Sequence, residues 1–225
     1  MSQTGTGTTG AYEHWDQQWR QDPAIAEWSR ADPDVVAVGT RIRDRGGQRS
    51  LDVGCGVGRH TLALASLGFE SYGVDRSEAG LERVLQEANR RGATVELRSA
   101  DMTSLPFPGG SFDFVVAWNV VYHGTAEDAA RAIAEVTRVL RPGGRYLSTM
   151  LSKRNVEFGK GQEIAADTFV QPGGPQDKAH PHLYCDADDL LALHPGLALL
   201  SAVDREHSAS GSYHWHLQFD KPVSI

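Results

Sequence analysis

The stretch Leu51-Asp52-Val53-Gly54-Cys55-Gly56-Val57-Gly58 joins a short apolar run to three glycines at alternate positions. It predicts a β-strand that ends in a tight loop, because glycine has no Cβ and tolerates a positive φ. Residues 59–67 follow as a predicted helix, whose N-terminal N–H groups would point at the ligand of the loop. The stretch therefore predicts a strand, a loop and a helix that together bind a nucleotide-like group.

The spacing of these glycines separates the known kinds of nucleotide-binding loop. A dinucleotide-binding loop follows the pattern G-x-G-x-x-G, and Arg59 takes the place of its third glycine. A phosphate-binding P-loop ends in Gly-Lys-Ser/Thr, which does not follow here. The remaining pattern, an acidic residue before three alternate glycines, resembles motif I of the class I S-adenosylmethionine-dependent methyltransferases.

Later parts of the chain continue the order that this resemblance implies. The further predicted elements are strands at Tyr72-Gly73-Val74-Asp75, 94–98, 112–118 and 146–151 and a helix at 127–140. The second strand ends in an acid, and the third leads to Ser99-Ala100-Asp101-Met102. The series covers residues 50–151 and is similar to small-molecule methyltransferases, including those of quinone biosynthesis and of the tellurite-resistance type.

The resemblance implies a cofactor and a place for it. S-adenosylmethionine would be the methyl donor and S-adenosylhomocysteine the product. Asp75 would accept hydrogen bonds from both ribose hydroxyls, Asp101 would lie near the adenine amino group, and the backbone N–H of a neighbour of Asp101 near the ring. The residues implied in cofactor binding are Asp52, Gly54, Cys55, Gly56, Asp75, Arg76, Asp101, Met102, Trp118 and Asn119.

The alternation of strands and helices predicts a single α/β domain. The resemblance implies a Rossmann-like, doubly wound sheet of seven strands, mostly parallel, with an antiparallel C-terminal strand and helices on both faces. We expect a disordered tail at 1–10 and one methyltransferase domain at 11–225. The predicted parts of this domain are an N-terminal helical lid at 11–48, a cofactor-binding core at 49–151, and an acceptor-pocket loop with closing strands at 152–225.

Composition narrows the choice of partners. The formal net charge of −7 and the lack of a long basic run argue against nucleic acid as a partner. No apolar stretch approaches the ~20 residues that span a bilayer, so no membrane partner is expected. The two cysteines, Cys55 and Cys185, do not indicate a disulfide framework. We therefore expect a cytoplasmic protein, a monomer or a homodimer, that acts on a small-molecule acceptor.

Aromatic residues cluster before the first predicted strand. Tyr12, Trp15 and Trp19 occupy positions i, i+3 and i+7, which is one face of a helix, and Trp28 follows closely. Two interpretations stay open. The face packs on the protein core, or it covers the sulfonium and the acceptor as a lid, since aromatic faces attract cations. On the second interpretation, Tyr12, Trp15 and Trp19 contact the acceptor.

His123 lies just after the fourth predicted strand, in Trp118-Asn119-Val120-Val121-Tyr122-His123. Ligands of doubly wound sheets bind at the carboxyl ends of the strands, so this is the expected region of the site. Methyl transfer from a sulfonium is an in-line displacement, and it needs a base only where the acceptor must lose a proton. We predict that His123 is a general base or orients the acceptor. The alternative is a histidine that only hydrogen-bonds a loop.

The last third of the chain is predicted to shape the acceptor pocket. Residues 152–184 form a long polar connection, 186–193 a short helix with Asp186 as its N-cap, and 197–206 and 212–219 a closing pair of strands. Two His-x-His pairs lie in this third, and strand alternation places both members of the second pair on one face. The acceptor-binding candidates are His180, His182, His214 and His216.

Histidines at this spacing can also share a metal ion. The two pairs lie far apart in the sequence and methyl transfer from sulfur needs no metal, so no metal site is predicted. Three functions remain open: a small-molecule methyltransferase, a nicotinamide-dependent Rossmann oxidoreductase, and a non-catalytic protein that binds S-adenosylmethionine. The missing third glycine disfavours the oxidoreductase. A nucleic-acid methyltransferase is disfavoured because Asn119-Val120-Val121-Tyr122 replaces the expected Asn/Asp-Pro-Pro-aromatic motif.

Overall fold

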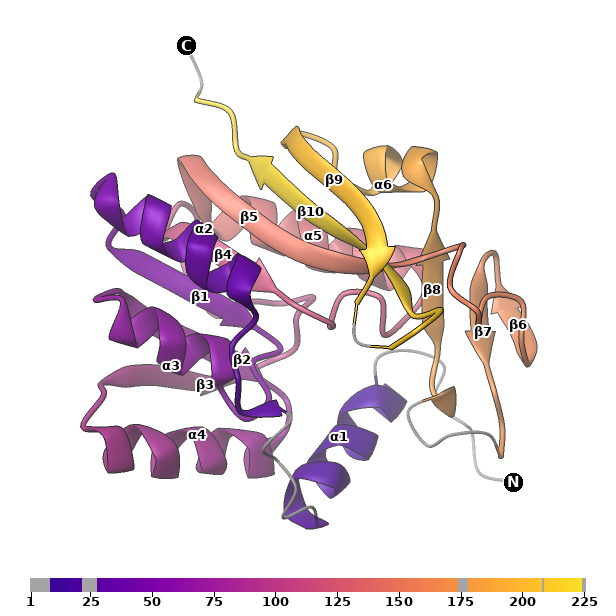
Figure 1. The fold of residues 1–225 in the computed structure, drawn as a ribbon, viewed down its shortest axis with the longest axis horizontal. Helices are drawn as coiled ribbons and strands as arrows, with labels where there is room; N and C mark the ends of the chain where they lie inside the picture. The colour runs from indigo at the N-terminus through magenta and orange to yellow at the C-terminus, as the bar shows by residue number, and fades with distance from the viewer. Residues whose placement is uncertain (1–8, 22–27, 174–177, 208, 224–225) are drawn as a thin grey trace.

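The computed structural model describes residues 9–21, 28–173, 178–207 and 209–223. The helices in this part of the chain are α1 (Thr9–Gln21), α2 (Pro33–Asp44), α3 (Arg59–Ser66), α4 (Glu78–Arg91), α5 (Ala126–Val139) and α6 (Ala187–Leu193). The strands are β1 (Arg49–Val53), β2 (Glu70–Asp75), β3 (Val95–Ser99), β4 (Phe112–Ala117), β5 (Leu140–Ser152), β6 (Gln162–Ala165), β7 (Thr168–Val170), β8 (His182–Cys185), β9 (Ala198–Glu206) and β10 (Tyr213–Asp220). They form one sheet in the order β3-β2-β1-β4-β5-β8-β7-β6, and β10 pairs with β5 and β9 (Figure 1).

Parallel pairing gathers the strand ends that matter for function. β1 pairs in parallel with β2 and β4, β2 with β3, and β4 with β5. Their carboxyl ends therefore meet at one edge of the sheet, where the chain leaves β1 at Gly54 and β4 at Trp118. β10 runs antiparallel to both β5 and β9. The predicted sheet, mostly parallel with an antiparallel C-terminal end, is confirmed.

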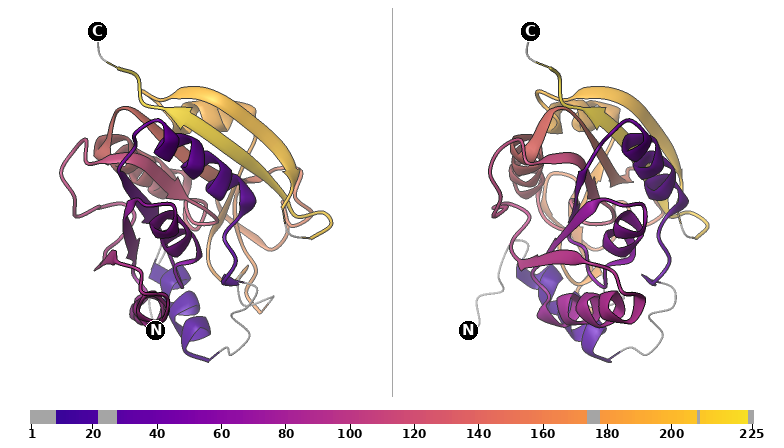
Figure 2. Two further views of the ribbon diagram at one scale, coloured as in Figure 1. Left: turned by 60° about the vertical axis from the view of Figure 1, so that its left-hand side comes forward. Right: turned by 90° about the vertical axis from the view of Figure 1, so that its left-hand side faces the viewer.

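Alternate residues of β4 divide the core into two layers. Val115 and Ala117 belong to an apolar cluster that includes α5, whereas Phe114 and Val116 belong to a second cluster that includes residues of α2 and α3. Successive side chains of a strand point to opposite faces, so an entirely apolar strand is buried on both. Figure 2 shows helices on the two sides of the sheet. The predicted covering of both faces by helices is confirmed.

The predicted number of strands is wrong. The sheet has ten strands, not seven, because the segment 152–184 contains β6, β7 and β8 instead of a long irregular connection. β6 and β7 form a short hairpin, with a positive φ of 54° at Asp167, and β8 pairs in parallel with the end of β5. β6 and β7 are only four and three residues long, and no Asn-Gly or Asp-Gly pair marks their turn. Periodicity therefore does not reveal them.

The two ends of the chain differ in how well they were predicted. The helix α1 begins at Thr9, so Thr9 and Gly10 belong to it and not to a disordered tail. The rest of the predicted tail, residues 1–8, lies outside the described residues. The closing strands are confirmed as β9 and β10, and Asp186 caps α6 by accepting hydrogen bonds from two backbone N–H groups. Among the described helices, none is both long enough and apolar enough to cross a membrane.

The loop between β1 and α3 packs so closely that two of its glycines have no room for a side chain. Gly54 and Gly58 have positive φ angles of 65° and 80°. A Cβ on Gly54 would lie 2.5 Å from Val120, and a Cβ on Gly58 would lie 2.6 Å from Val84 of α4. The loop therefore sets how closely β1, α4 and the connection after β4 approach one another.

Asp52 supports this loop from inside the protein. Its Oδ2 accepts hydrogen bonds from the backbone N–H and the hydroxyl of Thr61, at 3.0 Å and 2.8 Å. Burial raises the pKa of Asp52 to about 7. The carboxylate thus ties the end of β1 to the first turn of α3, which holds the loop between them.

We expect Gly58→Ala to destabilise the fold more than Gly92→Ala. Both glycines have a left-handed backbone, which costs an alanine about 1–2 kcal/mol. Only the Cβ at position 58 would clash, and overpacking of buried Val84 adds about 1–3 kcal/mol. Urea unfolding measures both variants. In a Val84→Ala background, Gly58→Ala should no longer lower the free energy of unfolding more than Gly92→Ala does. An equal loss of unfolding free energy in the two single variants would contradict this account.

Candidate functional site

Two adjoining cavities lie at the carboxyl edge of the parallel strands. The first is bounded by the loop after β1, by residues at the ends of β2 and β4, and by α1. The second, of about 630 Å³, lies between α1, the connection after β4, and residues of the last third of the chain. The residues that line both cavities are Trp15, Trp28, Asn119 and His123. Because the cavities share this wall, groups bound in the two can meet.

Asp75 is the central carboxylate of the first cavity. Its Oδ2 accepts the N–H of Gly56 at 2.7 Å, and its Oδ1 accepts the N–H of Ser77 at 2.8 Å. Burial raises the pKa of Asp75, and these backbone N–H groups oppose the shift. Each carboxylate oxygen has two lone pairs. Asp75 therefore retains capacity to accept hydrogen bonds from hydroxyl groups in the cavity.

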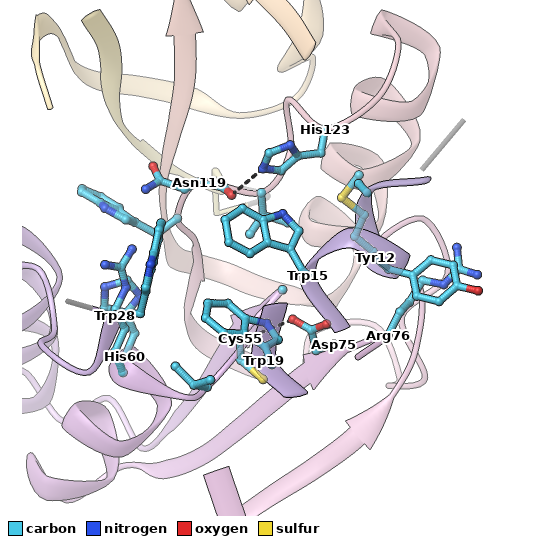
Figure 3. Close-up of a pocket in the computed structure, with 18 of the residues that line it drawn as sticks. Tyr12, Trp15, Trp19, Trp28, Cys55, His60, Asp75, Arg76, Asn119 and His123 are labelled. Carbon is cyan, nitrogen blue, oxygen red and sulfur yellow. Dashed lines mark hydrogen bonds between the residues drawn. The ribbon is translucent and has the colours of Figure 1, made fainter. Parts of the chain in front are cut away.

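Arg76 and Asp101 lie together at another part of this cavity. Arg76 donates a hydrogen bond of 3.0 Å to Oδ2 of Asp101, and its guanidinium lies over the ring of Tyr12, 3.8 Å from the centroid. Oδ1 of Asp101 accepts hydrogen bonds from the N–H and hydroxyl of Thr103. These contacts connect α1 to the ends of β2 and β3, and Figure 3 shows Arg76 beside Tyr12.

Indole rings from the N-terminal segment fill much of the first cavity. Trp15 and Trp19 are stacked with centroids 5.3 Å apart, and Trp28 packs edge-on against both (Figure 3). Trp19 is buried and lies 3.4 Å from the position that a Cβ on Gly56 would take. About 130 Å³ of the cavity is open, whereas pockets for drug-sized ligands have about 300–1,000 Å³. The indoles therefore occupy space that a nucleoside-sized ligand needs.

Asp16 fastens α1 to the N-terminus of α4. Its Oδ1 accepts hydrogen bonds from the hydroxyl of Ser77 and the N–H of Ala79, at 2.8 Å and 3.1 Å. A carboxylate at this place also interacts favourably with the helix dipole. Its Oδ2 forms an ion pair with Arg20 within α1. The aromatic pattern of α1 gave no indication of Asp16, because its partners lie in a distant part of the sequence.

Asn119 and His123 form the wall between the two cavities. Asn119 has a positive φ of 61°, and its N–H donates to the hydroxyl of Thr149 at 2.8 Å. Its carbonyl accepts a hydrogen bond from Nε2 of His123 at 3.1 Å (Figure 3). Nδ1 of His123 lies 2.9 Å from Nε2 of His180. Burial, together with His182 and His180, lowers the pKa of His123 well below its usual value, so the ring is neutral at pH 7.

A second group of histidines consists of His207, His214 and His216. The ring of His207 lies 4.7 Å from that of His214 and 5.2 Å from that of His216, measured between centroids. His214 lines the second cavity, whereas His216 packs edge-on against Trp118. Burial lowers the pKa of each to about 4. These histidines therefore provide uncharged polar groups at neutral pH.

The structure brings most of the predicted residues to the two cavities. The predicted cofactor residues that line the first are Gly54, Cys55, Gly56, Asp75, Arg76, Asp101, Met102, Trp118 and Asn119. The predicted acceptor residues that line one or both are Tyr12, Trp15, Trp19, His123, His182 and His214.

Three predicted residues line neither cavity. Asp52 is bonded to Thr61, so we reassign it from cofactor contact to support of the loop. His180 is buried against His123, and His216 against Trp118. Both were predicted to contact the acceptor, but burial beneath other side chains keeps them from the cavity surface.

Other lining residues were missed by the sequence analysis. Arg59 and His60 reach the first cavity from the first turn of α3, and Lys178 and His207 line the second. For Arg59 a signal existed, because it follows the glycine loop directly at a helix N-terminus. Burial lowers the pKa of Arg59, and Asp52 opposes that shift. Lys178 and His207 lie outside any motif, so only the folded chain places them here.

Comparisons with known proteins show the family of this chain. Residues 51–148 match the family model described as a methyltransferase domain. A demethylmenaquinone methyltransferase from Symbiobacterium thermophilum is 32% identical over 72% of this chain and 67% of its own length. A 27-O-demethylrifamycin SV methyltransferase from Amycolatopsis mediterranei is 30% identical over 64% of this chain and 56% of its own. The chain spans little more than half the length of the first curated relatives that it matches.

The same fold occurs in solved structures. The magnesium protoporphyrin IX methyltransferase from Synechocystis PCC 6803, solved with bound S-adenosylmethionine, superposes with a TM-score of 0.68. It is 18% identical, and the superposition covers 98% of this chain and 100% of the other. At this identity the likeness concerns the fold alone.

We expect Asp16→Ala to release α1 from α4, whereas Arg20→Ala should leave it in place. Only the first change removes the acceptor of the Ser77 and Ala79 hydrogen bonds; the second removes an exposed ion pair within α1. Release should expose Trp15 and Trp19, seen as a red shift of tryptophan emission and greater acrylamide quenching. The same emission from both variants would show that Asp16 does not hold the helix.

Proposed function

Because this chain belongs to the family of S-adenosylmethionine-dependent methyltransferases, we propose that it transfers the methyl group of S-adenosylmethionine to a small-molecule acceptor. S-adenosylhomocysteine is the second product. The observation that carries the proposal is the meeting of the glycine loop, Asp75 and Asp101 in one cavity that shares a wall with a second, larger one. The arrangement supports a donor site beside an acceptor site.

In the proposed donor site, each part of the cofactor has a partner of matching chemistry. The free lone pairs of Asp75 accept hydrogen bonds from the ribose hydroxyls. Asp101 and Met102 lie beside the adenine, and Arg76 closes that end. The half-buried guanidinium of Arg59 binds the α-carboxylate of the methionyl group, because an arginine in a low-dielectric cavity favours an anion.

We propose that α1 and the segment after it, 11–48, form a lid over the donor. The open space of about 130 Å³ is too small for the cofactor, so the indoles of Trp15 and Trp19 move outward when it binds. Residues 22–27 of this segment lie outside the described part. Aromatic faces that remain beside the sulfonium stabilise its positive charge. Of the two interpretations of the aromatic stripe, the position of α1 over the cavity supports the lid.

The second cavity is the proposed acceptor site, and the last third of the chain, 152–225, shapes it. Its volume of about 630 Å³ suits a drug-sized molecule. The indoles of Trp15 and Trp28 and the ring of Tyr122 offer flat surfaces, while Lys178 and the histidines offer polar groups. An aromatic acceptor that carries hydroxyl groups fits this lining.

In the proposed reaction, the acceptor attacks the methyl carbon in line with the departing sulfur, so the site positions two groups and excludes water. His123 lies at the boundary between them and remains the predicted orienting residue. Its Nε2 carries a proton, because it donates to the carbonyl of Asn119, so Nδ1 is its only basic atom. Nε2 of the buried His180 lies 2.9 Å from that atom, so His180 positions the ring of His123 from behind.

Two other functions from the sequence analysis are less well supported. A nicotinamide-dependent oxidoreductase needs a third glycine where Arg59 stands, and Arg59 lines the first cavity. A non-catalytic binding protein needs no acceptor site, whereas the second cavity opens beside the first. We further propose a cytoplasmic protein without a nucleic-acid partner, supported by two free cysteines and a net charge of −7, and a monomer or homodimer.

Incubation with methyl-labelled S-adenosylmethionine and mass-fractionated cell extracts tests the proposed reaction. We expect the label to appear in one or a few small molecules, together with an equal amount of S-adenosylhomocysteine. His123→Ala should lower the turnover number for the labelled compound about 10²-fold or more, if this residue acts in proton transfer. Tight binding of S-adenosylhomocysteine without any labelled product would favour the non-catalytic protein.

Calorimetry with two ligands tests the donor site. S-adenosylhomocysteine carries the α-carboxylate, whereas 5′-methylthioadenosine has the same nucleoside without it. We expect Asp75→Asn to weaken the binding of both ligands at least about tenfold, because both contain the ribose. Arg59→Gln should weaken the binding of S-adenosylhomocysteine by a similar factor and leave the binding of 5′-methylthioadenosine unchanged. Circular dichroism checks that both variants fold, and an equal loss of both ligands in Arg59→Gln would refute the role given to Arg59.

A further inference from the structure

We propose that His123, His180 and His182 form a binding site for a divalent transition-metal ion, such as Zn²⁺, at the wall of the second cavity. One ring nitrogen from each lies within 4.8 Å of the other two, and all three side chains are buried. In the part of the chain that the structure describes, this is the one group of three histidine, cysteine or carboxylate side chains placed to hold a metal ion. The fold thus joins a histidine after β4 to a pair at the start of β8.

Hydrogen bonds to backbone carbonyls fix the proton positions on two of the rings. Nε2 of His123 lies 3.1 Å from the carbonyl oxygen of Asn119, and Nδ1 of His182 lies 2.8 Å from that of His180. A carbonyl oxygen only accepts, so both nitrogens carry protons. The lone pairs remain on Nδ1 of His123 and Nε2 of His182. Metal-binding histidines donate their other ring N–H to carbonyls in this way.

The separation of the rings suits a shared ion. Nδ1 of His123 and Nε2 of His180 are 2.9 Å apart, and the three ring centroids are 4.6–4.9 Å apart. Two imidazole nitrogens bound to one tetrahedral Zn²⁺ lie about 3.4 Å apart. A small rotation of the side chains therefore makes room for the ion, and His180 then carries its proton on Nδ1. No proton is released, because each ring stays neutral.

The charges near the three histidines determine which kind of fourth ligand the ion favours. Each of the rings of His123 and His182 keeps one lone pair, so the ion displaces no proton from either. Lys178 acts electrostatically on both rings and opposes a cation, while Glu157 lines the same cavity and attracts one. His14 of α1 packs against His180, with centroids 5.8 Å apart. Three neutral ligands leave the full charge of the ion, which favours an anionic fourth ligand.

The charge of the bound ion indicates which class of acceptor the site favours, and this inference rests on the proposed function. His123 and His182 both line the second cavity, so the open position of the ion faces an acceptor there. The favoured acceptors carry an ionisable oxygen or sulfur, such as a phenol or a thiol. When a phenol binds, its O–H bond breaks and the proton leaves to water. The oxygen then forms a bond to the methyl carbon, the S–CH₃ bond breaks, and its electron pair stays on sulfur.

The test is a titration of the full chain, without a histidine tag and freed of metal by a chelator, with Co²⁺. Visible absorption of Co²⁺ reports its coordination, and we expect one ion per chain, displaced by Zn²⁺. His180→Gln and His182→Gln should each weaken binding at least about tenfold. His216→Gln is the matched control, because His216 is a buried histidine outside the trio, and it should bind as the unaltered chain does.

Absence of Co²⁺ binding by the unaltered chain, or equal affinity in the two variants, overturns the metal site. If a variant fails to fold, the quenching of Trp15 fluorescence by Co²⁺ tests the metal site instead, because the ring of Trp15 lies 6.2 Å from that of His123, measured between centroids. Bound Co²⁺ should quench emission in the unaltered chain much more than in Trp15→Phe, and equal quenching in both refutes the site. Methyl transfer without Co²⁺ binding rejects only the metal site, whereas Co²⁺ binding without methyl transfer rejects only the proposed function.

Discussion

The close approach of the loop after β1 to its neighbours is the constraint on which the site depends. Side chains at Gly54 and Gly58 would collide with Val120 and Val84, so the loop keeps β1, α4 and the connection after β4 together. That closeness lets Asp75 accept the N–H of Gly56. The same carboxylate holds Ser77 at the N-terminus of α4, where Asp16 attaches α1. The helix α1, the proposed lid, is thus fastened to the element that the loop positions.

The sequence predicts those parts of the site that lie at strand ends. Asp75 ends one predicted strand and Asp101 follows the next, and parallel strands end at one edge, so their meeting with the glycine loop follows from order alone. Burial is harder to predict than position. Asp52 carries the same motif signal as a ligand-binding acid, yet the hydroxyl and N–H of Thr61 use its carboxylate inside the protein. The position of Thr61 in the first turn of α3 turns Asp52 inward, and hydrophobic periodicity does not reveal that contact.

The histidines show the same limit on the acceptor side. The spacing of His180 and His182 indicates a pair, but the sequence has no pattern that joins them to His123. Their meeting depends on β8, which pairs in parallel with the end of β5 and was not predicted. Burial is the largest cause of the lowered pKa values of His123 and His182, so that packing keeps these two rings neutral. The chemistry of the acceptor site therefore depends on long-range contacts, whereas that of the donor site depends on local motifs.

The position of Trp15 couples the two sites. Its indole lines both cavities and is stacked on Trp19, which lies against the glycine loop. On the proposed function, a nucleoside that enters the first cavity would displace Trp19, and the stacked partner on the same helix would move with it. His14, the neighbour of Trp15 on α1, also lines the second cavity. The proposal therefore implies that donor binding reshapes the acceptor cavity, which would take its working form only after the donor has entered.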